Sequence, residues 1–320
     1  MRAHPDVLDL EIMTAGDTTA ASGPVGYAGL GLDRGGDQRA DPAWIAGLAA
    51  DPRAIVRPLW RDQCFTAAEP PVPLTLRADA VDPAQLVFLG LDDGVPNFAV
   101  DLSDLPLDEV LSRTGADGTA DIRSLFTGLP AAEAAAFAYA RGLLFWHRRQ
   151  RHCGCCGSAA EMRNAGHLRV CTNDECGTLL FPRIEPAVIT LVETVTPPRR
   201  CLLARHRASK AGGYSMVAGF VEIGESLEDA VRREVLEEVG VALRTVDFVG
   251  SQPWPFPAGL MIGFRATATD ESISVDGTEI LEARWFTREE LRDYAETTGR
   301  LGRPDSIDRV MLTAWLAEGA

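Results

Sequence analysis

Three glutamates lie close together in the segment GFVEIGESLEDAVRREVLEEVGV (219–241). Glu234, Glu237 and Glu238 are spaced at i, i+3 and i+4, so a helix would place them on one face. Like charges at this spacing weaken an isolated helix, and divalent cations between the carboxylates would offset the repulsion. Oxygen ligands suit Mg²⁺ or Mn²⁺, and Arg233 can orient one carboxylate by a bidentate pair. The segment predicts a metal-binding helix; the alternative is a solvated acidic face.

The same segment contains signals for both ends of that helix. Ser226 is a good N-cap, Asp229 three residues later completes a predicted capping box, and Gly240 is placed to end the helix. A glycine-rich loop precedes Ser226. Apolar residues recur at helical spacing and are expected to pack on a sheet: Leu227, Ala230, Val231, Val235 and Val239.

A second chemical signal is a cluster of cysteines between residues 151 and 182. Cys153 and Cys156 form a C-x2-C pair, and Cys171 and Cys176 form a C-x4-C pair. Four thiolates on two such knuckles fit tetrahedral Zn²⁺ in a closed structural site, and a segment this small needs metal to fold. The alternative is four ordinary thiols.

The other cysteines and nearby histidines are not needed for that site. Cys155 lies between the ligands without a mate, and Cys64 and Cys201 sit beside apolar residues as expected for core thiols. His152 and His167 are alternative ligands, but four thiols already complete the set.

Segment 219–241 fits the pattern G-x5-E-x7-R-E-U-x-E-E-x-G-U, where U is apolar, and so resembles a Nudix box. The matching positions are Gly219, Glu225, Arg233, Glu234, Val235, Glu237, Glu238, Gly240 and Val241. The resemblance implies a Nudix hydrolase, which cleaves a nucleoside diphosphate linked to another moiety. It implies that Glu234 and Glu238 bind the metal with the carbonyl of Ala218, and that Glu237 is a ligand or the general base.

The segment SQPWPFPAGLM (251–261) resembles the signature of the NADH pyrophosphatase group of that family. Its expected substrate-binding positions are Gln252, Pro253, Trp254, Pro255, Phe256, Pro257 and Gly259. Prolines stiffen the segment, so it would present Trp254 and Phe256 to a substrate with two flat rings at low entropic cost. The alternative is a stiff connection that faces the core.

The resemblance implies further contacts. Glu279 occupies the place of an additional metal-binding carboxylate, with Glu282 as its rival by spacing. Phe220 is expected to flank the nicotinamide, with Phe181 of a partner subunit on the other side, where relatives often have tyrosine.

Two departures from the group's pattern affect the substrate side. Gly259 replaces a serine, so a hydroxyl contact is lost or supplied otherwise, and Asp308 stands where relatives have a small residue.

The group's typical assembly and substrates give the remaining expectations. The group is typically a homodimer. Its members cut NADH or NAD⁺ to nicotinamide mononucleotide and AMP, and some remove NAD caps from RNA. The basic run HRRQRH (147–152) could touch such RNA, although a solvated helix end is the commoner role of such a run. Two alternatives remain: an ADP-ribose or other nucleotide diphosphatase, and a catalytically silent zinc-ribbon module that binds RNA.

Three regions are needed to position these residues. Residues 1–150 are expected to form a divergent β-rich domain with strands at 86–91 and 97–102 joined by a hairpin turn, a loop at 18–38, and a helix from Ala131 to Arg149. Residues 151–182 form the zinc ribbon. Residues 183–320 alternate strands and helices, and the resemblance makes them a Nudix α/β/α sandwich, within a mixed α+β chain.

Composition limits the function classes. The 320-residue chain has a formal net charge of −15, which argues against broad attraction to nucleic acid or anionic membranes. The sequence contains neither a run of 18 apolar residues nor a signal-peptide pattern, so we expect a cytoplasmic protein.

Overall fold

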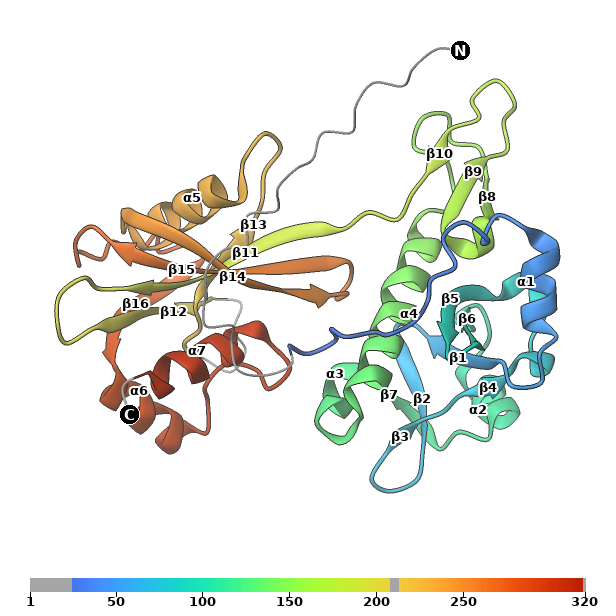
Figure 1. Cartoon of the computed structure of the whole chain (residues 1–320), viewed down its shortest axis with the longest axis horizontal. Helices are drawn as coiled ribbons and strands as arrows, with labels where there is room; N and C mark the ends of the chain where they lie inside the picture. The colour runs from blue at the N-terminus through green and yellow to red at the C-terminus, as the bar shows by residue number, and fades with distance from the viewer. Residues whose placement is uncertain (1–24, 208–212, 319–320) are drawn as a thin grey trace, which may run out of the picture.

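A computed structural model describes residues 25–207 and 213–318. Two α/β units lie side by side and are joined through a small three-stranded sheet (Figure 1). Within the described residues, no helix has the length and apolar character required to cross a membrane.

The N-terminal unit is a seven-stranded sheet with helices packed on it. Its strand order is β3-β2-β1-β6-β5, with β4 paired to β1 and β7 to β2. The predicted hairpin joins β5 to β6 through Asp93 and Gly94, both with positive φ. The strands are β1 (Ile55–Trp60), β2 (Gln63–Ala67), β3 (Val72–Pro73), β4 (Leu76–Arg77), β5 (Val87–Asp92), β6 (Val95–Asp101) and β7 (Gly118–Ala120). The helices are α1 (Pro42–Ala49), α2 (Leu107–Thr114), α3 (Ile122–Leu125) and α4 (Ala131–Arg149).

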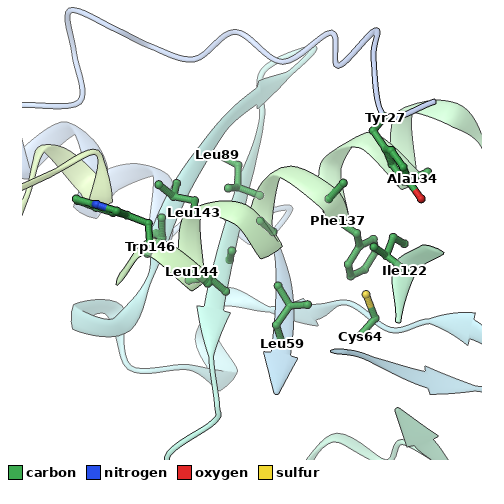
Figure 2. Close-up of a cluster of buried hydrophobic side chains, with 14 of the residues drawn as sticks. Tyr27, Leu59, Cys64, Leu89, Ile122, Ala134, Phe137, Leu143, Leu144 and Trp146 are labelled. Atoms are coloured by element: carbon green, nitrogen blue, oxygen red, sulfur yellow. The ribbon is translucent and has the colours of Figure 1, made fainter. Parts of the chain in front are cut away.

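Helix α4 provides the core of this unit and has the predicted bounds. Its buried Phe137 and Leu144 pack against strand residues such as Leu59 and Leu89 (Figure 2). Cys64 is fully buried in the same core, as expected, and burial raises the pKa of its thiol to about 12.

The small sheet consists of antiparallel β8 (Ala160–Arg163), β9 (Leu168–Cys171) and β10 (Leu179–Leu180). Two histidines attach it to the N-terminal unit. His147 Nε2 is 2.8 Å from the carbonyl oxygen of Gly166, and His167 Nε2 is 2.8 Å from that of Phe88. Burial lowers the pKa of both imidazoles to about 4, so both are neutral near pH 7.

The C-terminal unit is a six-stranded mixed sheet between helical layers. Its order is β14-β15-β11-β12-β16, with β13 paired to β11. One apolar cluster joins the sheet to α5, and a separate one joins its other face to α7. The strands are β11 (Glu185–Glu193), β12 (Arg200–His206), β13 (Val217–Phe220), β14 (Leu243–Trp254), β15 (Gly259–Ala268) and β16 (Ile280–Thr287). The helices are α5 (Leu227–Val239), α6 (Arg288–Thr298) and α7 (Ile307–Ala317).

The β14–β15 hairpin carries the proline segment from this sheet to α4 of the other unit (Figure 1). Strand β14 is at the sheet edge, where proline is tolerated. Arg141 Nη1 of α4 donates to the carbonyl oxygen of Pro255 at 2.7 Å. A Cβ atom on Gly142 would lie 2.9 Å from Cβ of Pro255, so the hairpin meets α4 where the helix has no side chain.

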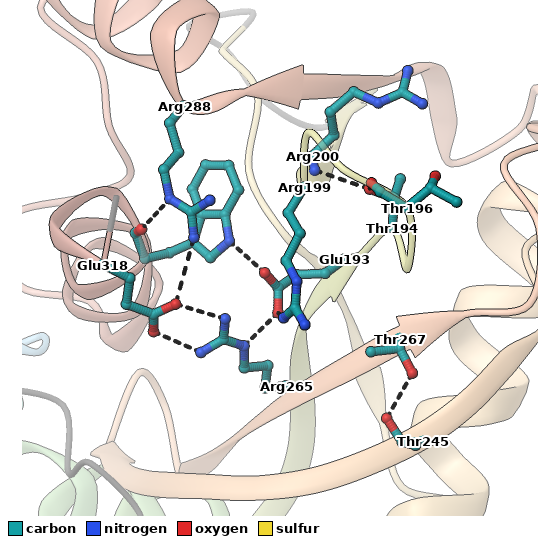
Figure 3. Close-up of polar contacts among 11 residues, drawn as sticks. Glu193, Thr194, Thr196, Arg199, Arg200, Thr245, Arg265, Thr267, Arg288 and Glu318 are labelled. Carbon is teal, nitrogen blue, oxygen red and sulfur yellow. Dashed lines mark hydrogen bonds and ion pairs between the residues drawn. The ribbon is translucent and has the colours of Figure 1, made fainter. Parts of the chain in front are cut away.

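A buried charge network fastens α7 to the sheet (Figure 3). Glu193, only 1% exposed, accepts from Trp315 Nε1 at 2.7 Å and from Arg265 Nε. Arg265 also holds Glu318 through two hydrogen bonds of 2.6 and 2.7 Å. The network satisfies a carboxylate that would otherwise be strongly unfavourable in the interior.

We expect Arg265→Ala to destabilise the C-terminal unit by about 3 kcal/mol, because it removes the nearest cation from buried Glu193. Urea unfolding followed by circular dichroism measures the change. Arg284→Ala is the matched control, since it breaks an exposed pair with Glu290 and is expected to cost about 1 kcal/mol or less. Equal effects of the two substitutions would contradict the structural role of the Glu193 network.

Candidate active site and cysteine cluster

Helix α5 begins and ends where the sequence predicts. The Ser226 hydroxyl accepts from the backbone N–H of Asp229 at 3.1 Å, and Gly240 ends the helix with φ of 71°. The Ser226 hydroxyl also donates to the Asp229 carboxylate at 2.7 Å. In a capping box that carboxylate would instead accept from the backbone N–H of Ser226, so the predicted capping box is only half formed. The apolar face is buried at Ala230, Val231, Val235 and Val239.

Arg233 is the centre of the site's hydrogen bonding. It holds Glu225 in a bidentate pair at 2.6 and 3.0 Å and donates to Glu234 at 2.9 Å and to Glu237 at 3.2 Å. It also donates to the carbonyl oxygen of Phe220 at 2.9 Å. The sequence predicted one oriented carboxylate and gave Glu225 no role; the structure shows one guanidinium linking the loop before the helix to two site carboxylates.

The three glutamates have different surroundings. Glu238 is 6% exposed and its Oε2 has no hydrogen-bond partner, whereas the Glu237 side chain is 62% exposed. The pKa of Glu238 is raised to about 8. Burial is the main cause, and repulsion from Glu234, Glu279 and Asp276 adds to it. Burial also raises the pKa of Glu234. The three glutamates share one face of the continuous helix, as expected, but Glu234 and Glu238 lie on its buried side and Glu237 at its solvent edge.

Strand β13 passes directly over Glu234. A Cβ atom on Gly219 would lie 1.9 Å from Cδ of Glu234, so only glycine leaves room for the carboxylate. Ala218, whose carbonyl is an expected ligand, precedes it, and Phe220 follows with 62% exposure. A buried carboxylate oxygen without a partner, beside two further carboxylates, has the donor chemistry that suits a divalent cation.

Glu279 lies near these carboxylates, because its charge raises the pKa of both Glu234 and Glu238. Its rival Glu282 instead pairs with Arg205 at 2.9 Å. Asp276, which sequence analysis missed, accepts backbone N–H bonds from Thr278, Glu279 and Ile280 and so fixes the turn that carries Glu279. The Asp-Gly-Thr sequence at 276–278 is a turn signal that would have identified it.

The prediction that Gln252 contacts substrate is wrong for this structure. Gln252 is fully buried; its Nε2 donates to the carbonyls of Gly26 and Asp305 at 3.0 and 2.6 Å, and its Oε1 accepts from Ile307 N at 2.7 Å. Asp308 is also buried, 5% exposed, within the first turn of α7, so it is not available to a ligand either.

The Trp254 and Phe256 rings, predicted to face a substrate, also face the interior of the protein. Both rings pack against the core of the N-terminal unit, with Tyr27 5.0 Å from Phe256 and 6.1 Å from Trp254 between ring centroids. Arg141 and Arg123 also lie over the Phe256 ring. These two residues therefore match the alternative expectation, a stiff connection that faces the core.

The remaining members of the segment take different positions. Pro253, Pro255 and Gly259 line a cavity of about 670 Å³ between the units. The carbonyl oxygen of Pro257 lies close to Gly142, where the hairpin meets α4.

The four predicted cysteine ligands come together. The sulfur atoms of Cys153, Cys156, Cys171 and Cys176 lie within 4.8 Å of one another. Within residues 25–207 and 213–318, this is the one group of three or more Cys, His, Asp or Glu residues that reaches such proximity. His152 and His167 are not in it, and Cys155 is exposed outside it. The donor set fits zinc.

Most of the basic run 147–152 is used within the protein. Arg148 pairs with Asp101 and Asp62, Arg151 pairs with Asp104, and His147 is buried. These contacts favour a structural role for the run over RNA binding.

Comparison with known proteins identifies two related domains. Residues 185–309 match the NUDIX domain, and residues 53–146 match the NADH pyrophosphatase-like rudimentary NUDIX domain. The chain is 44% identical over 168 residues to "NAD-capped RNA hydrolase NUDT12" of Homo sapiens, covering 50% of this chain and 36% of that protein.

Two further relatives come from a bacterium and a plant. "NAD-capped RNA hydrolase NudC" of Mycobacterium tuberculosis is 43% identical over 188 residues, covering 56% of this chain and 59% of that protein. "Nudix hydrolase 19, chloroplastic" of Arabidopsis thaliana is 35% identical over 254 residues, covering 75% and 57%. The matches thus span between about a third and three fifths of these relatives' lengths. The chain therefore contains a NUDIX domain preceded by a rudimentary NUDIX domain of the NADH pyrophosphatase type.

Proposed function

We propose that the protein hydrolyses the pyrophosphate bond of NADH or NAD⁺ to nicotinamide mononucleotide and AMP. The observation that carries the proposal is the buried Glu238, with one oxygen lacking a partner, beside Glu234 and Glu279. Mg²⁺ or Mn²⁺ would be held by these carboxylates and the Ala218 carbonyl. A bound cation would offset their repulsion and polarise the pyrophosphate.

The chain's own residues position the reactants. Arg233 fixes Glu234 and links it to the loop through Glu225. Gly219 lets the strand backbone approach the carboxylate. Glu237 is exposed, and its one side-chain contact among the described residues is the 3.2 Å contact with Arg233, so it can receive a proton from an attacking water or act as a further ligand.

The relatives named as NAD-capped RNA hydrolases support NAD(H) as substrate and extend the proposal to NAD caps on RNA. Phe220 and Phe181 are 62% and 58% exposed, so both rings are free to stack on a nicotinamide. Trp254 and Phe256 are instead used between the units. Because the proline segment does not present those rings to substrate, ADP-ribose is the second candidate.

We expect purified protein with Mg²⁺ or Mn²⁺ to release nicotinamide mononucleotide and AMP from NAD(H). Chromatography of the products measures the release. Glu238→Gln is expected to lower kcat by at least about 100-fold, because it removes a metal-binding charge. Glu228→Gln, on the exposed side of the same helix, is the matched control and keeps wild-type activity. Turnover of ADP-ribose alone would support the second candidate, and equal activity of both variants would refute the assigned metal site.

We also propose that the four-cysteine cluster binds structural Zn²⁺. Purified wild type is expected to contain one zinc per chain by elemental analysis, and Cys156→Ser is expected to lose it and unfold at a lower temperature. Cys155→Ser is the matched control, because its sulfur lies next to the cluster in sequence but outside it in space. Retention of zinc by Cys156→Ser would contradict the assignment.

We propose a cytoplasmic homodimer as the working form. None of the seven cysteines forms a disulfide, which suits a reducing compartment. Exposed apolar side chains flank the paired strands β11 and β13: Phe181 and Ile184 precede β11, Phe220 ends β13 and Ile223 follows it.

Sedimentation equilibrium is expected to give a dimer for wild type and a weakened dimer for Phe181→Asp, because the substitution places a charge in the apolar patch. Val72→Asp, which changes another exposed apolar residue, in the N-terminal sheet, is the control. A monomeric wild type would overturn this proposal.

A further inference from the structure

The segment before Glu279 is bonded to the C-terminal end of α5. The backbone N–H of Asp276 donates to the carbonyl oxygen of Glu238 at 3.2 Å, and that of Ser274 donates to the carbonyl oxygen of Val239 at 2.9 Å. Both carbonyls belong to the last turn of the helix, where carbonyls have no partner within the helix. The segment is therefore tied to the backbone of Glu238, the buried carboxylate of the proposed metal site.

The Asp276 carboxylate shapes the turn that follows. Its Oδ2 accepts from the backbone N–H groups of Thr278 and Glu279 at 3.0 and 2.8 Å, and its Oδ1 accepts from that of Ile280 at 2.8 Å. One side chain thus satisfies three successive N–H groups, while its own backbone is bonded to Glu238.

Arg207, which directly follows β12, holds the same turn through its carbonyl groups. Its Nε donates to the carbonyl oxygen of Thr278 and its Nη2 to that of Gly277, each at 2.8 Å. Its backbone N–H donates to the carbonyl oxygen of Glu279 at 2.8 Å. A guanidinium presents its N–H groups in a rigid fork, so bonds to two successive carbonyls fix the orientation of the turn.

The Glu279 side chain has no such support of its own. It is exposed, and within the described residues its carboxylate makes neither a hydrogen bond nor an ion pair. Burial, and then the charges of Glu234 and Glu279, raise the pKa of Glu238, which places Glu279 near it. Because the Glu279 carboxylate has no partner, its position beside Glu238 depends on the backbone of the turn.

We propose that Arg207 and Asp276 are positioning residues for Glu279, and that their bonds to the turn set the affinity of the site for a divalent cation. Neither side chain is itself a ligand; both act through the backbone that carries one. This inference rests on the metal site of the proposed function, but not on which nucleotide is hydrolysed.

Calorimetric titration of Mn²⁺ into the full-length protein, without nucleotide, measures cation affinity independently of turnover. Arg207→Gln is expected to weaken Mn²⁺ binding at least about tenfold, as is usual for residues that orient a metal ligand. The sign is decisive, because loss of the positive charge alone would leave cation binding unchanged or make it tighter. Asp276→Ala, which keeps the backbone bond to α5, is also expected to weaken binding.

Two matched controls change the same residue types outside the turn. Arg205→Gln breaks the pair with Glu282 on neighbouring strands, and Asp270→Ala removes an exposed carboxylate that accepts from the N–H of Ser272. Both are expected to keep wild-type Mn²⁺ affinity, and circular dichroism checks that every variant is folded.

A double substitution separates positioning of Glu279 from a general loss of structure. Glu279→Gln alone is expected to weaken Mn²⁺ binding, and adding Arg207→Gln to it is expected to have little further effect, because no ligand is left to position. Unchanged or tighter binding in Arg207→Gln, or an equal loss with and without Glu279, would overturn the proposal. Absence of Mn²⁺ binding by wild type would overturn the metal site and this proposal together, whereas Mn²⁺ binding without hydrolysis of NAD(H) would contradict only the substrate.

Discussion

The close packing of the β14–β15 hairpin on α4 determines how the two units are arranged. An extended hairpin would be free to swing, but proline rings, a backbone contact to Arg141 and the side-chain-free surface of Gly142 fix its tip. The rings of Trp254 and Phe256 then extend the core of the neighbouring unit. One strand edge of the NUDIX sheet is consequently held by the rudimentary domain, so this domain supports the sheet on which α5 packs.

Helix α5 combines stabilising caps and an apolar face with an unfavourable charge arrangement. Its caps and apolar face stabilise it, whereas Glu234 and Glu238 are buried near Glu279, where their charged forms are disfavoured. Arg233 compensates only part of this repulsion, and Glu238 keeps one oxygen unsatisfied. Such local destabilisation is typical of sites whose geometry serves a ligand that is absent during folding.

Features encoded locally could be predicted from sequence. The bounds of α4 follow from Pro130, its alanine-rich sequence and its terminal arginines, and those of α5 from its caps and apolar periodicity. The spacing of Cys153 to Cys176 predicted that these cysteines come together. The failures at Gln252 and Trp254 have a different origin. In a strand, alternate side chains face opposite sides, and which side meets substrate depends on segments more than 50 residues away, such as the one containing Asp305. No pattern within the proline segment identifies those neighbours.

The contact between Tyr27 and Asp305 has a consequence for the order of folding. The Tyr27 hydroxyl donates to Asp305 at 2.7 Å across 278 positions of the chain, and Gln252 bonds the backbone of both segments. During synthesis, Tyr27 emerges early, but its partner emerges only after both sheets have been made. The two units can therefore fold one after the other, while the segment at Tyr27 must wait for the region preceding α7 before it reaches its final position.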